Sequence, residues 1–511
     1  MKNIIIIGGG IGGLSAALDL SDSGFNVEIY ERNSVCGGQA RSIHTKRCSN
    51  VYAWRVWTDG YYNFLNMAKR INVLDNLVKL PKYGARTMSL DIANFKSKWE
   101  YLKLLIKLAG MNIMSDKRLR KNDITFYDYI NPGEQATIDF IDEFVGPIIG
   151  MEARKATLFT IARGYHMTYT ANGLLKYTQI YVANQPYDDA IFAPWVKVLR
   201  EKGVIIHTQT PVESIEYDGV RVKSITVGGK PVEADDFILS LDQTAVAKLL
   251  TPSPLSEIPL FSDVCNIHKI GNELYFGFML YFSEKFANAS DSFTTYKQPW
   301  KPVIQNYSTV WTEKARKKCD SVELLQVSCL NLVAGYNGKT LQECSVDEAF
   351  AETMLQLRLS DTMNEIRTVS GKNIWEVMDG YEIWPYWATD SDGHIYNTLD
   401  EYKLSINSGV YELMPTTKTP VPNLYFGSVM ARTDVPMVSM EVACTAGRNA
   451  AGAIAEKYGK PIPVVYKHPK FLSHTLKPFR IIDSTFSFVP MSIIVIFLLI
   501  FLIWIFVIIH R

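Results

Sequence analysis

A glycine-rich turn near the N-terminus has the residue types and the spacing that bind a dinucleotide. Its glycines are Gly8, Gly10, Gly12 and Gly13. Gly8 permits a tight turn, Gly10 lets the backbone approach a pyrophosphate, and Gly13 lets the following helix lie close to the preceding strand. Unpaired N–H groups at the start of that helix attract phosphate, and the carboxylate of Glu31 accepts hydrogen bonds from ribose hydroxyls. The pattern predicts a dinucleotide site, and Glu31 argues against a 2′-phosphate in it.

The segments around this turn have the periodicity of a strand, a helix and a second strand. Ile4 to Ile7 form a short apolar run, as in a parallel strand that is covered on both faces. An apolar repeat at helical spacing follows from Leu14 to Leu18, and Gly24 lies where that helix would end. Val27 to Tyr30 form the second strand, and Glu31 comes directly after it. The glycines lie within a strand, turn, helix and strand that end in an acidic residue. This order makes the glycine motif specific for a dinucleotide site.

A second glycine pair could contribute to the same site. Gly37 and Gly38 are followed by Arg41 and Ser42. Two glycines with an arginine suit a second approach of the backbone to a pyrophosphate, although an ordinary loop would have the same composition. The pair is therefore a candidate phosphate contact that depends on the rest of the pattern.

The C-terminal part of the chain contains a strand and a helix of matching character. Asn423 to Phe426 indicate a strand that stops at Gly427. In the helical stretch that follows, Ala443, Gly447 and Ala451 recur every four residues. Because residues four apart lie on one helix face, we expect this face to pack closely against another backbone.

These motifs together resemble the FAD-dependent amine oxidase and phytoene desaturase superfamily. The desaturase-like branch fits better, because residues Trp54 to Asn63 resemble the segment after the glycine pair in phytoene desaturase-like and hydroxysqualene dehydroxylase-like proteins. Phe144 to Gly150 resemble their mid-domain loop, and Val204 to Val212 with Ala234 to Ser240 resemble the return of the chain to the flavin domain. The resemblance implies an FAD-dependent oxidoreductase in which the flavin carries the redox chemistry.

The resemblance also implies roles for individual residues. Glu31 would bind the AMP ribose, Gly38 and Arg41 would lie in the pyrophosphate region, and Val212 would meet the adenine through its backbone. The remaining cofactor contacts implied are Gly427, Met440 and Glu441, the last two beside the flavin pyrimidine. The family usually has Gly-Asp where this chain has Gly427-Ser428. This departure removes an expected carboxylate contact, although serine still forms hydrogen bonds.

The substrate side is less well defined. The pocket candidates are Trp54, Arg55, Trp57, Tyr61, Trp384 and Tyr386. Aromatic side chains are also common in ordinary cores, so each of them has that alternative. Arg55 is harder to explain as a core residue, because a buried guanidinium needs a partner. No catalytic side chain is identified from the sequence.

Composition and charge exclude several other classes. The 511 residues carry a net charge of +1, which gives no electrostatic basis for binding nucleic acid. The hydrophobic share of 47 % is too high for a disordered chain. Seven cysteines without a CxxC spacing predict neither disulfides nor a zinc site, and they indicate a reduced compartment. A metal centre is therefore not expected.

The predicted fold class is α/β, with a Rossmann-type FAD domain and a mixed α+β substrate domain. We expect the FAD domain to comprise residues 1–85, 195–255 and 415–460. The substrate domain would take 86–194 and 256–414, and residues 461–485 would form a linker.

The C-terminal residues 489–509 predict a transmembrane helix. Seventeen consecutive apolar residues run from Ile493 to Ile509. Twenty-one helical residues span about 31 Å, close to the thickness of a bilayer core. Basic residues before the run favour a single-pass C-terminal anchor with a cytosol-facing body, so a lipid bilayer is an expected partner. The basic, apolar segment 96–121 could also lie at a membrane interface, or it could be an ordinary helix with a solvated face.

Three function classes remain open from the sequence. The first is an FAD oxidoreductase that dehydrogenates a hydrophobic, isoprenoid-like substrate. The second is a flavin amine oxidase that produces peroxide, and the third is a non-catalytic flavin-fold scaffold. The sequence names neither the substrate, the electron acceptor nor the oligomeric state.

Overall fold

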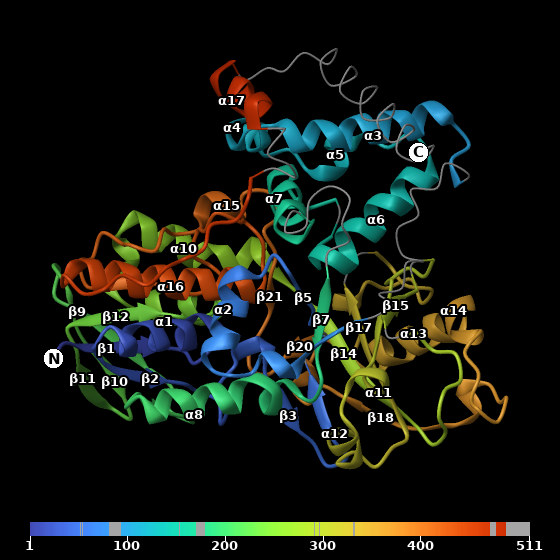
Figure 1. Cartoon of the computed structure of the whole chain (residues 1–511), viewed down its shortest axis with the longest axis horizontal. Helices are drawn as coiled ribbons and strands as arrows, with labels where there is room; N and C mark the ends of the chain where they lie inside the picture. The colour runs from blue at the N-terminus through green and yellow to red at the C-terminus, as the bar shows by residue number, and fades with distance from the viewer. Residues whose placement is uncertain are drawn as a thin grey trace, which may run out of the picture.

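The computed structural model in Figure 1 presents the chain as two sheet-containing halves with a helical layer above them. It describes residues 1–51, 53, 55–80, 94–152, 154–169, 179–290, 292–295, 297–330, 333–470 and 477–486. The predicted transmembrane run 489–509 and the pocket candidate Trp54 lie outside the described residues.

A five-stranded parallel sheet forms the first half. Its strands, in spatial order, are β22 (Leu424–Phe426), β12 (Asp236–Leu239), β1 (Asn3–Ile7), β2 (Asn26–Tyr30) and β8 (Ile205–His207). All four neighbouring pairs are parallel. The four isoleucines of β1 are at most 2 % exposed, because the strand is central and covered on both faces. The predicted Rossmann-like sheet is confirmed.

Two helices pack against each other beside this sheet, as Figure 1 shows. They are α1 (Ile11–Asp22) and α16 (Met440–Lys457). A Cβ placed on Gly447 would lie 2.0 Å from the carbonyl oxygen of Gly12, and one on Gly12 would lie 2.0 Å from the carbonyl oxygen of Gly427. Only glycine allows backbones this close. The predicted small-residue face of the C-terminal helix is confirmed.

The second half contains a five-stranded antiparallel sheet. Its order is β15 (Ser292–Thr294), β16 (Val303–Asn306), β17 (Glu323–Leu330), β14 (Tyr275–Phe282) and β18 (Met378–Ile383). Each neighbouring pair is antiparallel, so the sheet is not mixed in strand direction. All eight residues of β14 are buried because it lies in the sheet interior between β17 and β18.

The described residues also form smaller sheets. They are β3 (Ser42–His44) with β4 (Ser49–Val51); β5 (Trp57–Thr58), β7 (Ile180–Ala183) and β6 (Leu77–Lys79); β9 (Ser214–Tyr217), β10 (Val222–Val227) and β11 (Lys230–Glu233); β13 (Asn272–Glu273) with β21 (Lys403–Leu404); and β19 (Trp387–Thr389) with β20 (Ile395–Asn397). The pairing of β5 with β7 joins a predicted FAD-domain segment to a predicted substrate-domain segment.

The remaining helices cover the sheets and form the upper layer. They are α2 (Tyr62–Arg70), α3 (Lys98–Ile113), α4 (Asp116–Leu119), α5 (Phe126–Ile130), α6 (Gln135–Ile149), α7 (Leu158–Tyr169), α8 (Ala193–Glu201), α9 (Gln243–Leu250), α10 (Pro259–Gly271), α11 (Tyr307–Val310), α12 (Glu313–Lys317), α13 (Val346–Arg358), α14 (Asp361–Asn364), α15 (Val410–Leu413) and α17 (Lys477–Phe486). The expected mid-domain loop at residues 144–150 is instead mostly the end of α6, so that expectation was wrong.

The expected linker at 461–485 is also different in the structure. Its last part belongs to α17, where the carboxylate of Asp483 accepts hydrogen bonds from the backbone and hydroxyl of Ser115 at 2.7 Å. Asp483 also pairs with Arg118 at 2.7 Å, and Arg480 pairs with Asp116 at 3.1 Å. Ion pairs therefore hold α17 against α4. The sequence pattern of residues 461–485 gave no indication of this contact.

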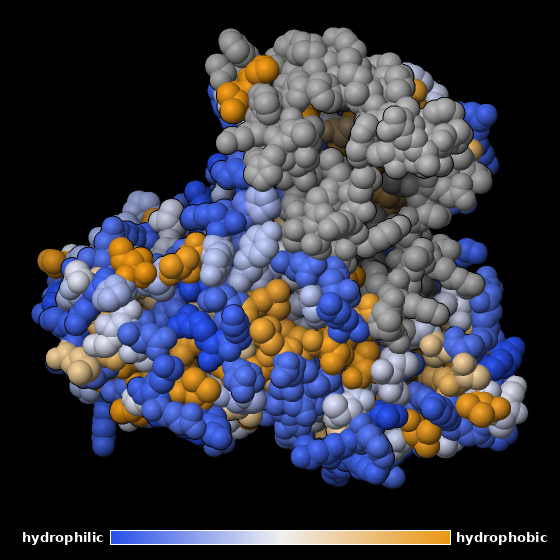
Figure 2. Space-filling view, in the orientation of Figure 1, coloured by the Kyte–Doolittle hydropathy of each residue, from blue (hydrophilic) through white to orange (hydrophobic). Residues whose placement is uncertain are grey.

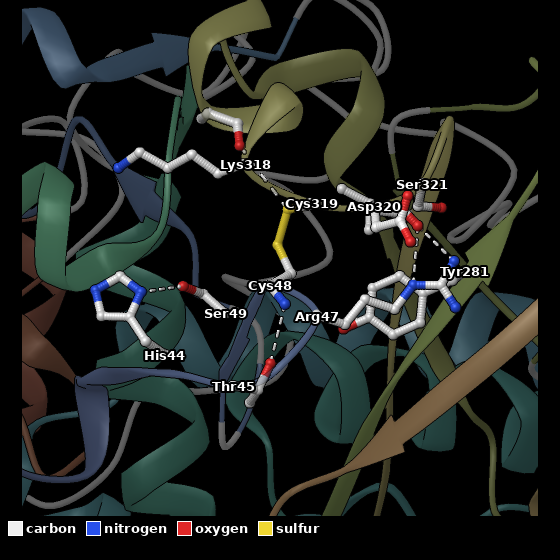
Figure 3. The surroundings of a disulfide bond; sticks show 12 residues. His44, Thr45, Arg47, Cys48, Ser49, Tyr281, Lys318, Cys319, Asp320 and Ser321 are labelled. Atoms are coloured by element: carbon white, nitrogen blue, oxygen red, sulfur yellow. Dashed lines mark hydrogen bonds between the residues drawn. A yellow bond between two sulfur atoms is a disulfide. The ribbon is translucent and has the colours of Figure 1, made fainter.

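A disulfide joins Cys48 to Cys319, which contradicts the expectation of reduced cysteines (Figure 3). The two residues are 271 positions apart, so no local spacing could reveal the pair. The bond connects the loop between β3 and β4 to the segment after α12. Arg47 supports the same junction, since its guanidinium donates to the carbonyl oxygen of Asp320.

Among the described residues, no helix is long and apolar enough to cross a bilayer.

We predict that Gly447→Ala lowers the free energy of unfolding by about 1–3 kcal/mol or more, because the new methyl group collides with the Gly12 carbonyl. Gly452→Ala is the matched control, since it lies in the same helix and its nearest neighbouring atom would be 3.6 Å away. There the gain in helix propensity should leave stability unchanged or raise it by up to about 1 kcal/mol. Denaturant unfolding of both variants measures the difference, and equal effects would contradict the close-packing argument.

Candidate functional site

A cavity of about 490 Å³ begins at the carboxyl ends of the parallel strands and extends toward the second half of the molecule. It receives residues from both halves, including Tyr275 and Lys403. The predicted site residues that line it are Gly8, Gly10, Gly12, Glu31, Gly38, Val212, Met440, Arg55 and Tyr61. Ser428, at the position where the resembling family has aspartate, also lines it.

The glycines give this cavity a floor without side chains. Gly8 has a φ of +105°, a conformation that the tight turn after β1 requires. Gly10 is the N-cap of α1. A Cβ on Gly10 would meet only the Cα of Gly38, at 3.9 Å. The backbone N–H groups that start α1 are therefore accessible from the cavity, as phosphate binding requires.

Gly13 has a different function from Gly10. A Cβ on Gly13 would lie 2.1 Å from the carbonyl oxygen of Gly8 and 3.2 Å from the side chain of Ile6. It therefore sets the close contact between helix and strand. Gly427 acts similarly, since its Cβ would lie 2.7 Å from the Ile238 side chain.

The carboxylate of Glu31 lies at the end of β2 and is held by backbone donors. One oxygen accepts a hydrogen bond from the N–H of Gly9 at 2.8 Å, and the other accepts from the backbone and amide of Asn33 at 2.8 and 2.9 Å. A carboxylate offers about four acceptor positions, so one remains for a hydroxyl group from the cavity.

The start of α16 faces the cavity, but the side chain of Glu441 points away from it. Glu441 accepts hydrogen bonds from the backbone N–H groups of Asn63 at 2.9 Å and Phe64 at 2.8 Å. It thus caps α2, whose N-terminus has no cap of its own. Only the backbone of this position can face a bound cofactor, while Met440 lines the cavity directly.

A histidine that the sequence analysis did not identify pairs with Glu441. The Nε2 atom of His468 lies 2.9 Å from the Glu441 carboxylate, and its Nδ1 atom lies 3.2 Å from that of Asp434. Burial alone would lower the pKa of His468, but its hydrogen bonds to the two carboxylates and their charges outweigh burial and raise the pKa to about 9. His468 is therefore charged at neutral pH.

Arg41 lies behind the cavity wall. Its guanidinium donates to the carbonyl oxygen of Gly38 at 2.8 Å and pairs with Glu401, which lines the cavity, at 2.9 Å. Trp384 and Tyr386 lie on the far side of this arginine, with ring centres 6.0 and 5.8 Å from it. Both aromatic residues were pocket candidates, and the structure places them around the Arg41–Glu401 pair instead.

The structure places the other pocket candidates in two different environments, the core and the cavity wall. Trp57 is fully buried and stacks on Phe64 with ring centres 5.6 Å apart, so it is a core residue. Tyr61 and Arg55 both line the cavity. Burial raises the pKa of Tyr61, which keeps its hydroxyl protonated. The guanidinium of Arg55 donates to the carbonyl oxygens of Gln39 at 2.9 Å and Ala53 at 3.3 Å.

Lys403 is a cavity residue for which the sequence contained no local signal. Its ammonium group donates to the carbonyl oxygen of Gly150 and lies 3.3 Å from Glu273. Burial lowers the pKa of Lys403; the charge of Glu273 opposes this, and the like charge of Arg55 lowers it further. The two cations are therefore electrostatic neighbours within one cavity.

Three potential metal ligands lie together elsewhere. They are His44, Asp188 and Asp189. Lys318 already pairs with Asp189 at 3.1 Å, and His44 is exposed. The group lies apart from the residues that line the cavity.

Comparison with known proteins identifies the family. A model described as flavin containing amine oxidoreductase matches residues 11–455. The chain belongs to this family. It is therefore an FAD-dependent oxidoreductase, which confirms the cofactor and the enzyme class predicted from the motifs.

Individual relatives are distant. A 4,4′-diaponeurosporene oxygenase of Staphylococcus aureus is 23 % identical over 302 residues, which cover 49 % of this chain and 57 % of that protein. The chain thus spans little more than half the length of the curated relatives it matches.

Solved structures of an oxidoreductase and of two amine oxidases share the fold. A Methanosarcina mazei oxidoreductase has a TM-score of 0.59 at 15 % identity and covers 89 % of this chain and all of its own. A putrescine oxidase bound to putrescine has a TM-score of 0.60 at 11 % identity, covering 89 % and 99 %. A cyclohexylamine oxidase from Brevibacterium oxydans has a TM-score of 0.56 at 14 % identity, covering 90 % and 99 %.

The residues of the cavity fit FAD. The glycine floor leaves room for a pyrophosphate at the start of α1, and Glu31 has an acceptor position left for a ribose hydroxyl. Two further acceptors, Oε2 of Glu401 and Oε1 of Gln243, are buried without a hydrogen-bond partner among the described residues. Both residues line the cavity, and the hydroxyl groups of FAD would satisfy such acceptors.

We predict that His468→Gln destabilises the protein by about 3 kcal/mol at pH 7, because a pKa raised from 6.5 to about 9 corresponds to roughly that much stabilisation of the charged form. The sign follows from the direction of the shift: the contribution is complete below pH 6.5 and is lost as the pH rises through about 9. Thermal unfolding of wild type and variant from pH 6 to 10 measures it. A difference between the two proteins that does not shrink above pH 9 would contradict the charged assignment.

Proposed function

We propose that this chain dehydrogenates a hydrophobic, isoprenoid-like substrate. The observation that carries the proposal is the composition of the cavity beyond the glycine floor. Its walls there include Val56, Tyr61, Tyr275, Leu404 and Met437. Apolar walls bind apolar substrates, because the buried area is removed from water on both partners.

FAD, when bound, would supply the oxidant: the two hydrogens removed from neighbouring carbons of the substrate balance its reduction to FADH2. The protein contributes orientation and electrostatics. The N-terminus of α16, where Ser439 accepts from the N–H of Val442 at 3.2 Å, directs a positive helix end at the cavity. Such an end stabilises negative charge that develops during hydride transfer. The apolar walls keep water from the reacting carbons.

The relatives agree with this proposal in part. The Staphylococcus aureus oxygenase acts, by its name, on 4,4′-diaponeurosporene, which is a hydrophobic carotenoid. The putrescine and cyclohexylamine oxidases share the fold alone. Because these two oxidases share the fold alone, the Staphylococcus aureus oxygenase is the better guide to the substrate class.

We predict that squalene or phytoene, dispersed in detergent, bleaches the visible flavin absorbance of the purified protein under anaerobic conditions. Putrescine and cyclohexylamine should leave the spectrum unchanged and yield no peroxide in air. Acid precipitation should release the flavin to the supernatant, as for a non-covalent cofactor. Peroxide formed from either amine would favour the amine oxidase alternative, and a flavin that no compound bleaches would favour a scaffold.

We further propose that residues 489–509 anchor the protein in a membrane with its body on the cytosolic side. In the sequence, this apolar run begins three residues after the end of α17. Two residues of α17, Ile481 and Ile482, are 56 % and 42 % exposed, and Trp99 and Leu102 on the neighbouring α3 are also exposed. Figure 2 shows a group of hydrophobic residues where Figure 1 draws α17. Exposed aliphatic and tryptophan side chains suit a membrane interface.

The alternative for segment 96–121, an ordinary helix with a solvated basic face, retains support. Several of its basic residues have partners within the protein. Lys103 pairs with Glu100 at 3.0 Å, Arg118 with Asp483 at 2.7 Å and Arg120 with Glu412 at 2.8 Å. The proposed interface therefore rests on the apolar residues of α3 and α17 more than on these charges.

We predict that a chain ending at Phe486 loses membrane association and keeps its flavin and its stability. A chain ending at Lys470 should lose about 1–3 kcal/mol of stability as well, because it also lacks the Asp483 contacts to Ser115 and Arg118. Fractionation, flavin content and denaturant unfolding compare the two with the full chain. If the chain ending at Phe486 still pellets with membranes at high salt, the anchor lies in the folded body.

A further inference from the structure

One carboxylate oxygen in the cavity wall has no hydrogen-bond partner among the described residues. It is Oε2 of Glu401, which lines the cavity and is 3 % exposed. Of the cavity residues that the structure describes, Glu401 alone has such a buried carboxylate oxygen. Because a buried acceptor without a partner destabilises a protein, and a charged one more so, we expect a ligand to supply the donor.

The other oxygen of Glu401 receives the described side-chain hydrogen bonds. Oε1 accepts from Arg41 at 2.9 Å, from Arg32 at 3.2 Å and from the amide of Asn33 at 3.4 Å. These donors come from the chain that follows β2, and together they fix the orientation of the carboxylate. Oε2 is therefore left for a donor from the cavity.

Glu401 lies beside Glu31, the acidic residue at the end of β2. The amide nitrogen of Asn33 donates to Oε1 of Glu31 at 2.9 Å and to Oε1 of Glu401 at 3.4 Å. One amide group thus bridges the two carboxylates, and all three residues line the cavity. A ligand group that binds Glu31 is therefore also close to Glu401.

Glu31 alone cannot accept hydrogen bonds from both hydroxyl groups of a ribose. Three of its roughly four acceptor positions are occupied by the N–H of Gly9 and by the backbone and amide of Asn33. One position remains, whereas the adjacent 2′- and 3′-hydroxyl groups of the adenosine ribose are two donors. The second hydroxyl group therefore needs another acceptor.

We propose that Glu401 is this acceptor, so that two carboxylates bind the adenosine ribose of FAD, one hydroxyl group each. In the dinucleotide motif, a single acidic residue after the second strand binds the ribose. In this chain the second carboxylate comes from the segment before β21, far from that motif in the sequence. The proposal concerns the cofactor alone, so it holds whichever substrate is oxidised.

The wild-type holoenzyme provides the first test. Two FAD analogues are used, one without the 2′-hydroxyl group of the adenosine ribose and one without the 3′-hydroxyl group. Exchange of the bound FAD against an excess of each analogue, followed by mass spectrometry of the bound flavin, gives the ratio of the two Kd values. We expect FAD to bind about 10- to 100-fold more tightly than either analogue, because each analogue loses a hydrogen bond to a carboxylate.

Variants assign each hydroxyl group to its carboxylate. Glu401→Gln and Glu401→Ala should reduce the preference for FAD over one analogue to about threefold or less, and keep the preference over the other. Glu31→Gln should give the reverse pattern. A general loosening of the fold weakens FAD and both analogues alike, so the Kd ratio isolates the hydroxyl contact.

Glu273→Gln is the matched control. Glu273 is buried and pairs with Lys403, close to Glu401 in the sequence, but it is not among the residues that line the cavity. This variant should keep both preferences. A variant that is purified without flavin is compared through the rise in Tm that FAD and each analogue produce, which reports the same preference.

Three outcomes would overturn the proposal. Equal binding of FAD and both analogues to the wild type would show that carboxylates do not bind the ribose hydroxyl groups. Unchanged preferences in both Glu401 variants would show that Oε2 does not contact the ribose. Loss of the same preference in Glu273→Gln would show that the effect of Glu401 is indirect.

Discussion

The approach of three glycine backbones is the constraint on which the rest of the site depends. Gly12 lies between Gly427 and Gly447, and a Cβ on Gly12 or on Gly447 would lie 2.0 Å from a carbonyl oxygen. Because α1 and α16 can meet this closely, their N-termini face the same cavity. The N-termini of both helices then present positive potential to one bound dinucleotide. A single helix end could reach only part of such a long ligand.

Buried charges fix the orientation of these helices. Arg448, near the middle of α16, pairs with Asp19 of α1 at 3.0 Å. At the N-terminus of α16, Glu441 caps α2 and pairs with His468. Removing one partner of such a pair costs more than the pair contributes, because the other charge stays buried. The segment after α16 therefore belongs to the flavin-binding half.

Much of the flavin-binding half could be predicted because its signals are local. The strand before Gly8, the helix after it and Glu31 all lie within one continuous stretch. The face formed by Ala443, Gly447 and Ala451 was also predictable, because a regular helix turns a four-residue repeat into a surface. The parallel sheet follows from these units, since parallel strands need helical crossovers between them.

The substrate side could not be predicted in the same way, because its contacts are long-range. Lys403 reaches Gly150 and Glu273, which are more than 100 residues away. Cys48 bonds to Cys319 across 271 residues, and no spacing rule covers such a pair. The prediction that Trp57 and Trp384 line the pocket was wrong for a related reason. Large aromatic side chains occur in pockets and in cores, and both of these are buried in the core.

Arg41 shows how the two halves of the cavity are connected. Its sequence position beside the second glycine pair indicates a pyrophosphate contact, and its hydrogen bond to the Gly38 carbonyl keeps it within that loop. Its ion pair, however, is with Glu401, two residues before Lys403. Arg41 therefore links the glycine loop to the segment just before β21 (Lys403–Leu404). Because the Arg41–Glu401 pair is almost fully buried, the loss of either partner would leave an uncompensated charge in the interior, so this link between the two halves is costly to break.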